Sequence, residues 1–516
     1  AVEGRLRVSD ARIRQAFGTH DVQGINVAVD LSAGAIEAKG KFLVGNVPAT
    51  VSWQYVYGAA PDKQPPLRIA AVLYENERAE LGIDVNDLVR GEVAAEITVV
   101  QDAKGERHVH VRADLTNAEL TLDGLSWSKP LGERGVFEFD VVKGTKYPVE
   151  MHNVRLDGEN VAIAGWMGAG PDFRVKEYRF PQFSLNVVSN FEASGKLRPD
   201  NVWEVTAKGA TYDGRDLFRS FFNPVPEKVG KNRPGIDLRA EFDTVLGFHG
   251  TSLRAVRVSV QKRAGRMTQL DARGTMVDAR AKAAGGKHLE ATLRPESGRP
   301  RLLVAAANDA GLAFKLVGFL PHAVGGEMNL EVNLDGKGAI ERSGRLQATH
   351  FHLLGDELSP DPFQEPGTRR RTGVREKVPF KFLELPFAVG QGQFMLNDAR
   401  LVGPVFSATG RGKIDFRTKR VQVSGTFTPA AGVNQMFGDI PILGELLGGP
   451  KGEGLFAWNF ALQGGLQNPQ ITFNPLSGIA PGFTRDFFPI LPEEPRTPPR
   501  KGSGGNRAEP GARASS

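Results

Sequence analysis

The feature that most constrains this chain is a two-residue alternation of apolar and polar side chains, which recurs along most of its length. In one segment Ile25, Val27 and Val29 alternate with Asn26 and Ala28. An alternation with a period of two is typical of a strand buried on one face only. Asp-Gly pairs between such segments, as at 157–158 and 213–214, are typical of tight hairpin turns. The pattern therefore predicts many short strands joined by turns.

The spacing of these segments predicts one continuous sheet. Strands and turns recur at roughly 10–18 residues, which is typical of antiparallel β-structure. No fixed internal period is present, which disfavours a propeller with regular blades. We expect a mainly β fold, a long twisted antiparallel β-meander curled into an elongated groove, because a flat sheet of this length must twist. We also expect a few short capping helices, at Asp10–Phe17, Gly214–Phe222 and Asp309–Phe319.

Several function classes find no support in the residues. The 516 residues include no Cys, which excludes disulfides and cysteine-bound metals, and the net charge of +6 is not diagnostic of a partner. His108 and His110 lie two apart on one strand, as do His350 and His352, but no third metal ligand is evident for either pair. We therefore predict no enzyme activity, no metal or cofactor and no nucleic-acid partner.

The stretch from Thr426 to Phe483 is the most distinctive part of the chain. Within it the period changes from strand to helix, with apolar residues at i, i+3, i+4 and i+7 and then a second short apolar run. The residues of this expected helical end-piece are Val433, Met436, Phe437, Ile440, Leu443, Leu446 and Leu447. Alternation returns after Gly448-Gly449-Pro450.

The phrases GVNQMFGDIP, GEGLFAWNF and NPLSGIAPGF in this stretch closely resemble the C-terminal domain of AsmA-like bacterial envelope proteins, in particular the YhdP-like members. The resemblance implies a middle β-groove region at 1–307 and a C-terminal domain at 308–488 with a helical end-piece at 432–448. Residues 489–516 form a basic, Pro-rich tail that we expect to be disordered. The segment 355–377 departs from the family, which commonly has a helix there, and its Arg369–Arg371 run is either a solvated loop or a contact for lipid head groups.

The resemblance implies a periplasmic protein that acts as a bridge and carries phospholipid to the outer membrane. It also implies that an N-terminal helix, which is not in the given sequence, anchors the protein to the inner membrane. The alternative, from TamB-like relatives of the family, is a periplasmic scaffold for outer-membrane protein assembly or envelope integrity. Expected partners are phospholipids, the inner membrane, and the outer membrane or its proteins. Alternation gives the candidate lipid-groove residues as Phe137, Phe139, Val141, Met328, Leu330, Val332, Leu334, Phe406, Ala408, Ile414, Phe416, Phe456, Trp458 and Phe460.

Overall fold

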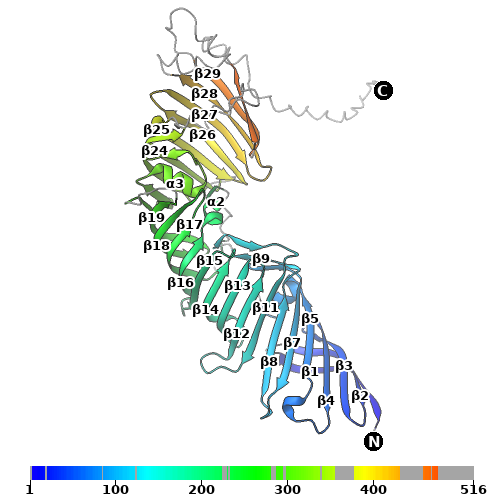
Figure 1. The fold of residues 1–516 in the computed structure, drawn as a ribbon. Helices are drawn as coiled ribbons and strands as arrows, with labels where there is room; N and C mark the ends of the chain where they lie inside the picture. The colour runs from blue at the N-terminus through cyan, green and yellow to red at the C-terminus, as the bar shows by residue number, and fades with distance from the viewer. Residues whose placement is uncertain are drawn as a thin grey trace, which may run out of the picture.

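The structure is a computed structural model, and it forms a long twisted sheet with the chain running from one end to the other (Figure 1). It describes residues 3–17, 20–83, 85–122, 125–222, 229–230, 233–279, 286–294, 298–336, 340–354, 377–429, 457–466 and 468–474. The expected helical end-piece at 432–448, the tail at 489–516, most of the segment 355–377 and Phe456 lie outside the described residues.

In the first half of the chain, the described residues form sixteen strands, one 3-10 helix and one α-helix. Their bounds are β1 Gly4–Phe17, β2 His20–Leu31, β3 Ala35–Val44, β4 Val47–Val56, η1 Pro61–Lys63, β5 Leu67–Leu73, α1 Glu75–Glu80, β6 Val89–Gly91, β7 Val93–Gln101, β8 Arg107–Asp114, β9 Ala118–Leu122, β10 Trp127–Lys129, β11 Gly135–Val142, β12 Val149–Gly158, β13 Val161–Ala169, β14 Val175–Leu185, β15 Ser189–Leu197 and β16 Val202–Asp213.

The second half begins with a helix and continues the sheet. Its elements are α2 Arg215–Phe222, β17 Gly235–Leu246, β18 Thr251–Arg263, β19 Arg266–Asp278, β20 His288–Leu293, β21 Leu302–Ala307, α3 Ala310–Val317, β22 Ala323–Val324, β23 Glu327–Asn333, β24 Arg342–Leu354, β25 Lys377–Gly390, β26 Gln393–Val402, β27 Phe406–Asp415, β28 Arg420–Pro429, β29 Trp458–Gly465 and β30 Asn468–Asn474.

Twenty-seven of the strands form one sheet in which almost every strand pairs with the next along the chain. The chain leaves the sheet twice, between β5 and β7 to form β6 and between β8 and β11 to form β9 and β10. These three strands make a separate three-stranded sheet, and in the long sheet β8 pairs with β11. One pair differs from the meander, because β16 and β17 run parallel. The sheet is therefore mixed, and this pair corrects the prediction of a purely antiparallel meander.

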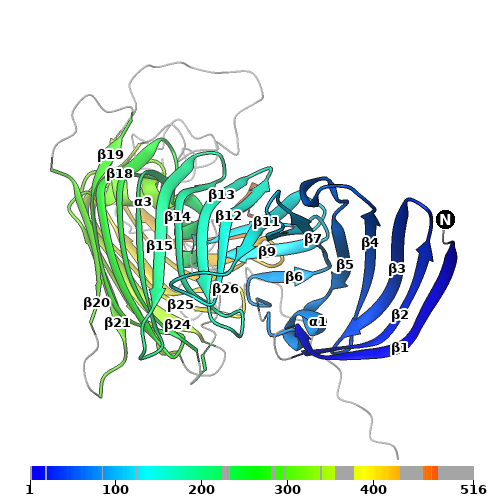
Figure 2. The ribbon, with the colours of Figure 1, turned by 90° about the horizontal axis from the view of Figure 1, so that it is seen from below.

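The predicted fold class is otherwise confirmed, since the chain is mainly β with few short helices and its sheet does not close into a barrel. Strands lie about 4.8 Å apart, so the sheet measures on the order of 120 Å across its strands. The strands bend strongly when viewed along the sheet (Figure 2). Within the described residues no helix is both long and apolar enough to cross a membrane.

Two local predictions are wrong. Asp10–Phe17 is not a helix but the second half of β1, where Ala11 and Ile13 pair with Ile25 and Val22 of β2. Asp213-Gly214 does not make a hairpin. Asp213 instead accepts hydrogen bonds from the backbone and the guanidinium of Arg215 and so starts α2. The helices predicted at 214–222 and 309–319 are confirmed as α2 and α3.

Candidate functional site

One face of the long sheet is apolar from strand to strand, because the register places apolar residues opposite one another. In the N-terminal part, one row crosses five strands through Val51, Ile69, Ile97, Val111 and Phe139. Near the C-terminus another row runs through Leu383, Leu401, Ala408, Phe427 and Trp458. We call this surface of the sheet the apolar face.

Where a strand carries one extra residue, a β-bulge keeps the apolar side chains before and after it on the same face of the sheet. On β12 the apolar residues Met151 and Val154 are three positions apart, yet both pack in the same cluster. Asn153 between them adopts a left-handed backbone with φ of 52°, which is the conformation of the extra residue in many bulges. The same spacing and a left-handed residue recur at Val8/Asp10/Ala11, Leu253/Ala255/Val256 and Leu396/Asp398/Ala399.

The opposite face of the sheet is polar and carries charged residues of both signs. A row of alternating charge crosses it through Glu96, Arg112, Glu138 and Arg155. Opposite charges on neighbouring strands stabilise a sheet modestly and keep this face in water. The two faces of each strand thus differ as the alternation predicts, and the buried core of the protein lies on the apolar face.

The structure places the described lipid-groove candidates on the apolar face. Phe137 and Phe139 have ring centroids 5.4 Å apart and pack against Met151, while Val141 pairs with Met151. The second group packs into two clusters, Met328 in one and Leu330, Val332 and Leu334 in the other. The remaining described candidates, on or beside β27 and β29, are Phe406, Ala408, Ile414, Phe416, Trp458 and Phe460. That these residues hold lipid stays a prediction.

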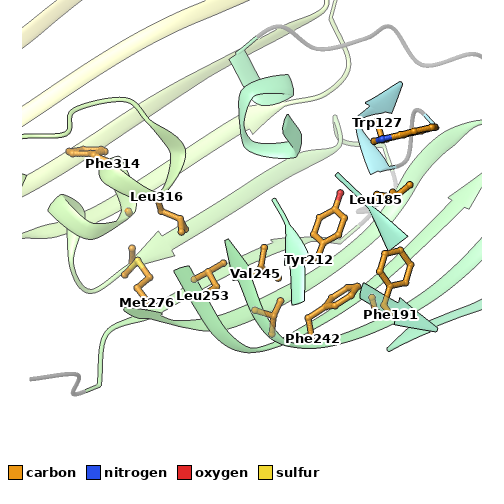
Figure 3. Packing of buried hydrophobic residues seen from close by; sticks show 14 of the residues in the cluster. Trp127, Leu185, Phe191, Tyr212, Phe242, Val245, Leu253, Met276, Phe314 and Leu316 are labelled. Carbon is orange, nitrogen blue, oxygen red and sulfur yellow. The ribbon is translucent and has the colours of Figure 1, made fainter. Parts of the chain in front are cut away.

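Over the middle of the sheet, other elements cover the apolar face. Figure 3 shows Phe191, Phe242, Leu253 and Met276 in one continuous layer between Trp127 on β10 and Phe314 on α3. The Phe314 side chain is 1% exposed, and its ring lies 6.4 Å from that of Phe351. This section of the apolar face is therefore a packed protein core.

Near the N-terminus the apolar face of β4 changes from buried to exposed along the strand. Val47 is 1% exposed at one end, whereas Trp53, Tyr55 and Tyr57 at and just beyond the other end are 38%, 40% and 47% exposed. We call these three residues the aromatic row. Neighbouring ring centroids in it are 6.2 and 6.0 Å apart.

The aromatic row is open on one flank. β5 pairs with β4 only from Ala49 to Ser52, so the strand end that carries the row has β3 as its only described neighbour. Gln64 takes the place of a neighbouring strand, since its side chain accepts from the Val56 amide and donates to the Val56 carbonyl. Gln64 thus satisfies the backbone at this end of β4, while the rings of the row face solvent.

The row differs in chemistry from the rest of the apolar face. Where that face is buried, its rings are mostly Phe, as in the stacked pairs Phe183–Phe191 and Phe387–Phe394. In the row the rings are Trp and Tyr, which combine an apolar body with a polar tip and suit a boundary between apolar and wet surroundings. Alternation alone identifies Trp53 and Tyr55 only as strand residues. The signal for the aromatic row is the consecutive Trp-x-Tyr-x-Tyr at 53–57.

A charged cluster on the polar face centres on Glu177, near the start of β14. The Glu177 side chain is 5% exposed and accepts hydrogen bonds from Lys146, Tyr147 and Arg179. These bonds, that from Lys146 above all, lower the pKa of Glu177 to about 2. Burial, together with the bond to Glu177, raises the pKa of Tyr147 to about 12. The cluster fastens the loop between β11 and β12.

Two of the four histidines noted in the sequence, His108 and His110, each pair with a single carboxylate. His110 lies 2.8 Å from Asp140, and His108 lies 3.3 Å from Asp102. Among the described residues no group of three or more His, Asp or Glu side chains is arranged to hold a metal ion. A hollow of about 640 Å³ beside β3, β4 and β5 is lined mainly from the polar face, where Arg68 is already paired with Glu96 at 2.9 Å.

Comparisons of the chain with protein-family models, with curated proteins and with solved structures gave no match.

Proposed function

We propose that the chain carries phospholipid along its apolar face as part of a bridge between the inner and outer membranes, and so supports outer-membrane lipid homeostasis. The observation that carries the proposal is the register, which keeps apolar residues on one face from β1 to β29. A chain that needed only to fold could bury its apolar residues in separate compact cores. A continuous apolar surface of this length instead suits ligands with long apolar chains.

The exposure of the aromatic row is a second observation that supports the proposal. Its rings are exposed although they continue the same apolar face, so this section of the face can contact a ligand without unfolding. Each methylene that an acyl chain buries on it contributes about 0.8 kcal/mol. The hydroxyl groups of Tyr55 and Tyr57 and the indole N–H of Trp53 offer hydrogen-bond donors to a polar head group.

The test is native mass spectrometry and lipid extraction of the purified 516-residue chain. Trp53→Asp with Tyr55→Asp places charge on the exposed apolar section, where it does not enter a packed core. Val332 and Trp458 are less suitable targets, because they are 2% and 7% exposed and a buried charge would unfold their surroundings. We expect co-purifying phospholipid in the native chain and at least a fivefold loss in the double variant.

Ser52→Asp is the matched control, because Ser52 lies on the polar face of the same strand between Lys39 and Arg68. The control keeps its lipid if the apolar face is the binding surface. A native chain that is free of lipid, and stays so after incubation with phospholipid vesicles, contradicts the proposal.

The second candidate function is a periplasmic scaffold that assists outer-membrane protein assembly or envelope integrity. The observation that favours it is the packed core over the middle of the sheet, where α3 and the small sheet already cover the apolar face. A scaffold predicts a lipid-free chain that binds an unfolded or nascent partner protein. The lipid extraction therefore separates the two functions.

A further inference from the structure

The aromatic row lies at the end of β4 that the covering elements leave open. The helix α1 meets the other end of this strand, where the Asn46 amide donates to the Glu80 carboxylate at 2.8 Å. The small sheet and α3 lie farther along the long sheet, where they contact Tyr212 and Phe351. The three rings of the row therefore form an exposed rim of the apolar face.

Half-buried residues connect this rim with the packed core. Ile69, Ile97 and Val111 lie in register with Val51, the residue two positions before Trp53. All four are only half-buried, and among the described residues they belong to none of the buried clusters. An acyl chain that contacts the rings can thus continue along the apolar face, and it reaches the packed core only beyond these residues.

The surroundings of the aromatic row carry balanced charge. The segments 31–39 and 53–66 contain two acidic and two basic residues, which pair as Glu37 with Lys39 and Asp62 with Lys63. A surface without net charge has no strong attraction for a polyanion. Trp and Tyr instead favour the boundary between hydrocarbon and water, because the ring is apolar and its tip forms hydrogen bonds. The chemistry of the row therefore fits the interface of a phospholipid bilayer.

We propose that the aromatic row docks the chain on the surface of a phospholipid bilayer, with the rings of Trp53, Tyr55 and Tyr57 at the level of the head groups. The inference rests on the proposed function, because a lipid carrier takes up its lipid from a bilayer or delivers it to one. In this position the open end of the apolar face meets the acyl chains of one leaflet. A lipid can then pass between the leaflet and the apolar face with little exposure of its acyl chains to water. Docking depends on apolar contact rather than on charge, so salt has little effect on it.

The test is co-flotation of the 516-residue chain with phosphatidylcholine vesicles, whose neutral surface excludes attraction to the basic residues after Pro495. The variant Tyr55→Ser/Tyr57→Ser removes two rings that are exposed, so it leaves no cavity in a core. Val100→Ser is the matched control, because Val100 is 41% exposed at the same end of the strands but lies on the polar face opposite His108.

We expect the native chain to float with the vesicles, the double variant to partition about fivefold less, and Val100→Ser to match the native chain. Raising the salt concentration tenfold should change the partition of the native chain by less than about twofold. Hydrogen exchange of the native chain is a measurement that needs no variant. Vesicles should slow the exchange of residues 53–57 and leave that of α3 unaltered.

Equal flotation of the double variant and the native chain overturns docking through the row, and so does exchange at 53–57 that vesicles leave unchanged. Flotation that salt abolishes overturns it as well. A native chain that co-purifies with phospholipid but does not float contradicts the docking and leaves the carriage of lipid standing. A native chain that neither carries lipid nor floats refutes the proposed function and the docking with it.

Discussion

Replacing Glu177 with Gln tests whether the charged cluster on the polar face fastens the loop between β11 and β12. The amides of Lys146 and Tyr147 donate to the Glu150 carboxylate at 3.1 and 3.3 Å, so their exchange with solvent reports opening of this loop. Glu177 holds the same loop through the Lys146 ammonium and the Tyr147 hydroxyl. Gln keeps the shape of the side chain and removes its charge.

The magnitude follows from the pKa of Glu177. A fall of this pKa from 4.5 to about 2 corresponds to about 3 kcal/mol of preference for the charged form. The partners Lys146 and Arg179 are 51% and 68% exposed, so solvent screening reduces the contribution to about 1–2 kcal/mol. We therefore expect the variant to exchange the two loop amides roughly 5–30-fold faster at pH 7.

The dependence on pH follows from the sign of the shift. Because folding lowers the pKa of Glu177, its stabilisation is complete above about pH 4.5 and is lost as the pH falls towards 2. Hydrogen exchange with mass spectrometry, corrected for the intrinsic rate at each pH, should show this loss in the native chain and its absence in Glu177→Gln. Identical protection of the loop in both proteins at pH 7 would refute the reasoning.

Three substitutions test the helices on the apolar face and the small sheet that covers part of it. Phe314→Ala should lower the free energy of opening of α3 by about 3–5 kcal/mol, because its buried ring leaves a cavity, whereas Leu217→Ala on the exposed side of α2 should change stability by less than about 0.5 kcal/mol. Arg78 is 2% exposed and donates to the carbonyls of three residues near α1 and β6, so Arg78→Met should cost about 3–5 kcal/mol in the local stability of the small sheet. Hydrogen exchange measures all three, and protection of α3 or of β6 that matches the native chain would count against the packing described.

Alternation alone was enough to predict most of the strands, the long sheet and which residues share the apolar face. The prediction failed at Asp10–Phe17, where Ala, Arg and Gln favour a helix locally. Asp10 there is not a helix cap but the left-handed residue of a bulge, with φ of 51°, and pairing with β2 outweighs local preference. Its signal in the sequence was the three-residue spacing of Val8 and Ala11, which recurs at the other bulges.

The parts that sequence reasoning missed depend on contacts between distant residues. The parallel pairing of β16 with β17 leaves no local mark, because Asp213-Gly214 suits a hairpin and a helix start equally well. The strands β6 and β10 have three residues each, which is too short for any period to emerge. Burial of Arg78 follows only from the carbonyl groups that surround it.

The measurement that tests the central claim most directly is quenching of Trp53 fluorescence by phospholipids brominated in their acyl chains. Bromine quenches only at close range, and Trp53→Phe removes this one indole and leaves the polar face intact, so the difference between the two proteins isolates its contribution. We expect quenching by the brominated lipid to be clearly reduced in Trp53→Phe, and we expect Ser52→Asp to be quenched like the native chain. Lipid that binds the chain with equal quenching in the native protein and in Trp53→Phe would contradict the claim that the exposed apolar face is where lipid lies.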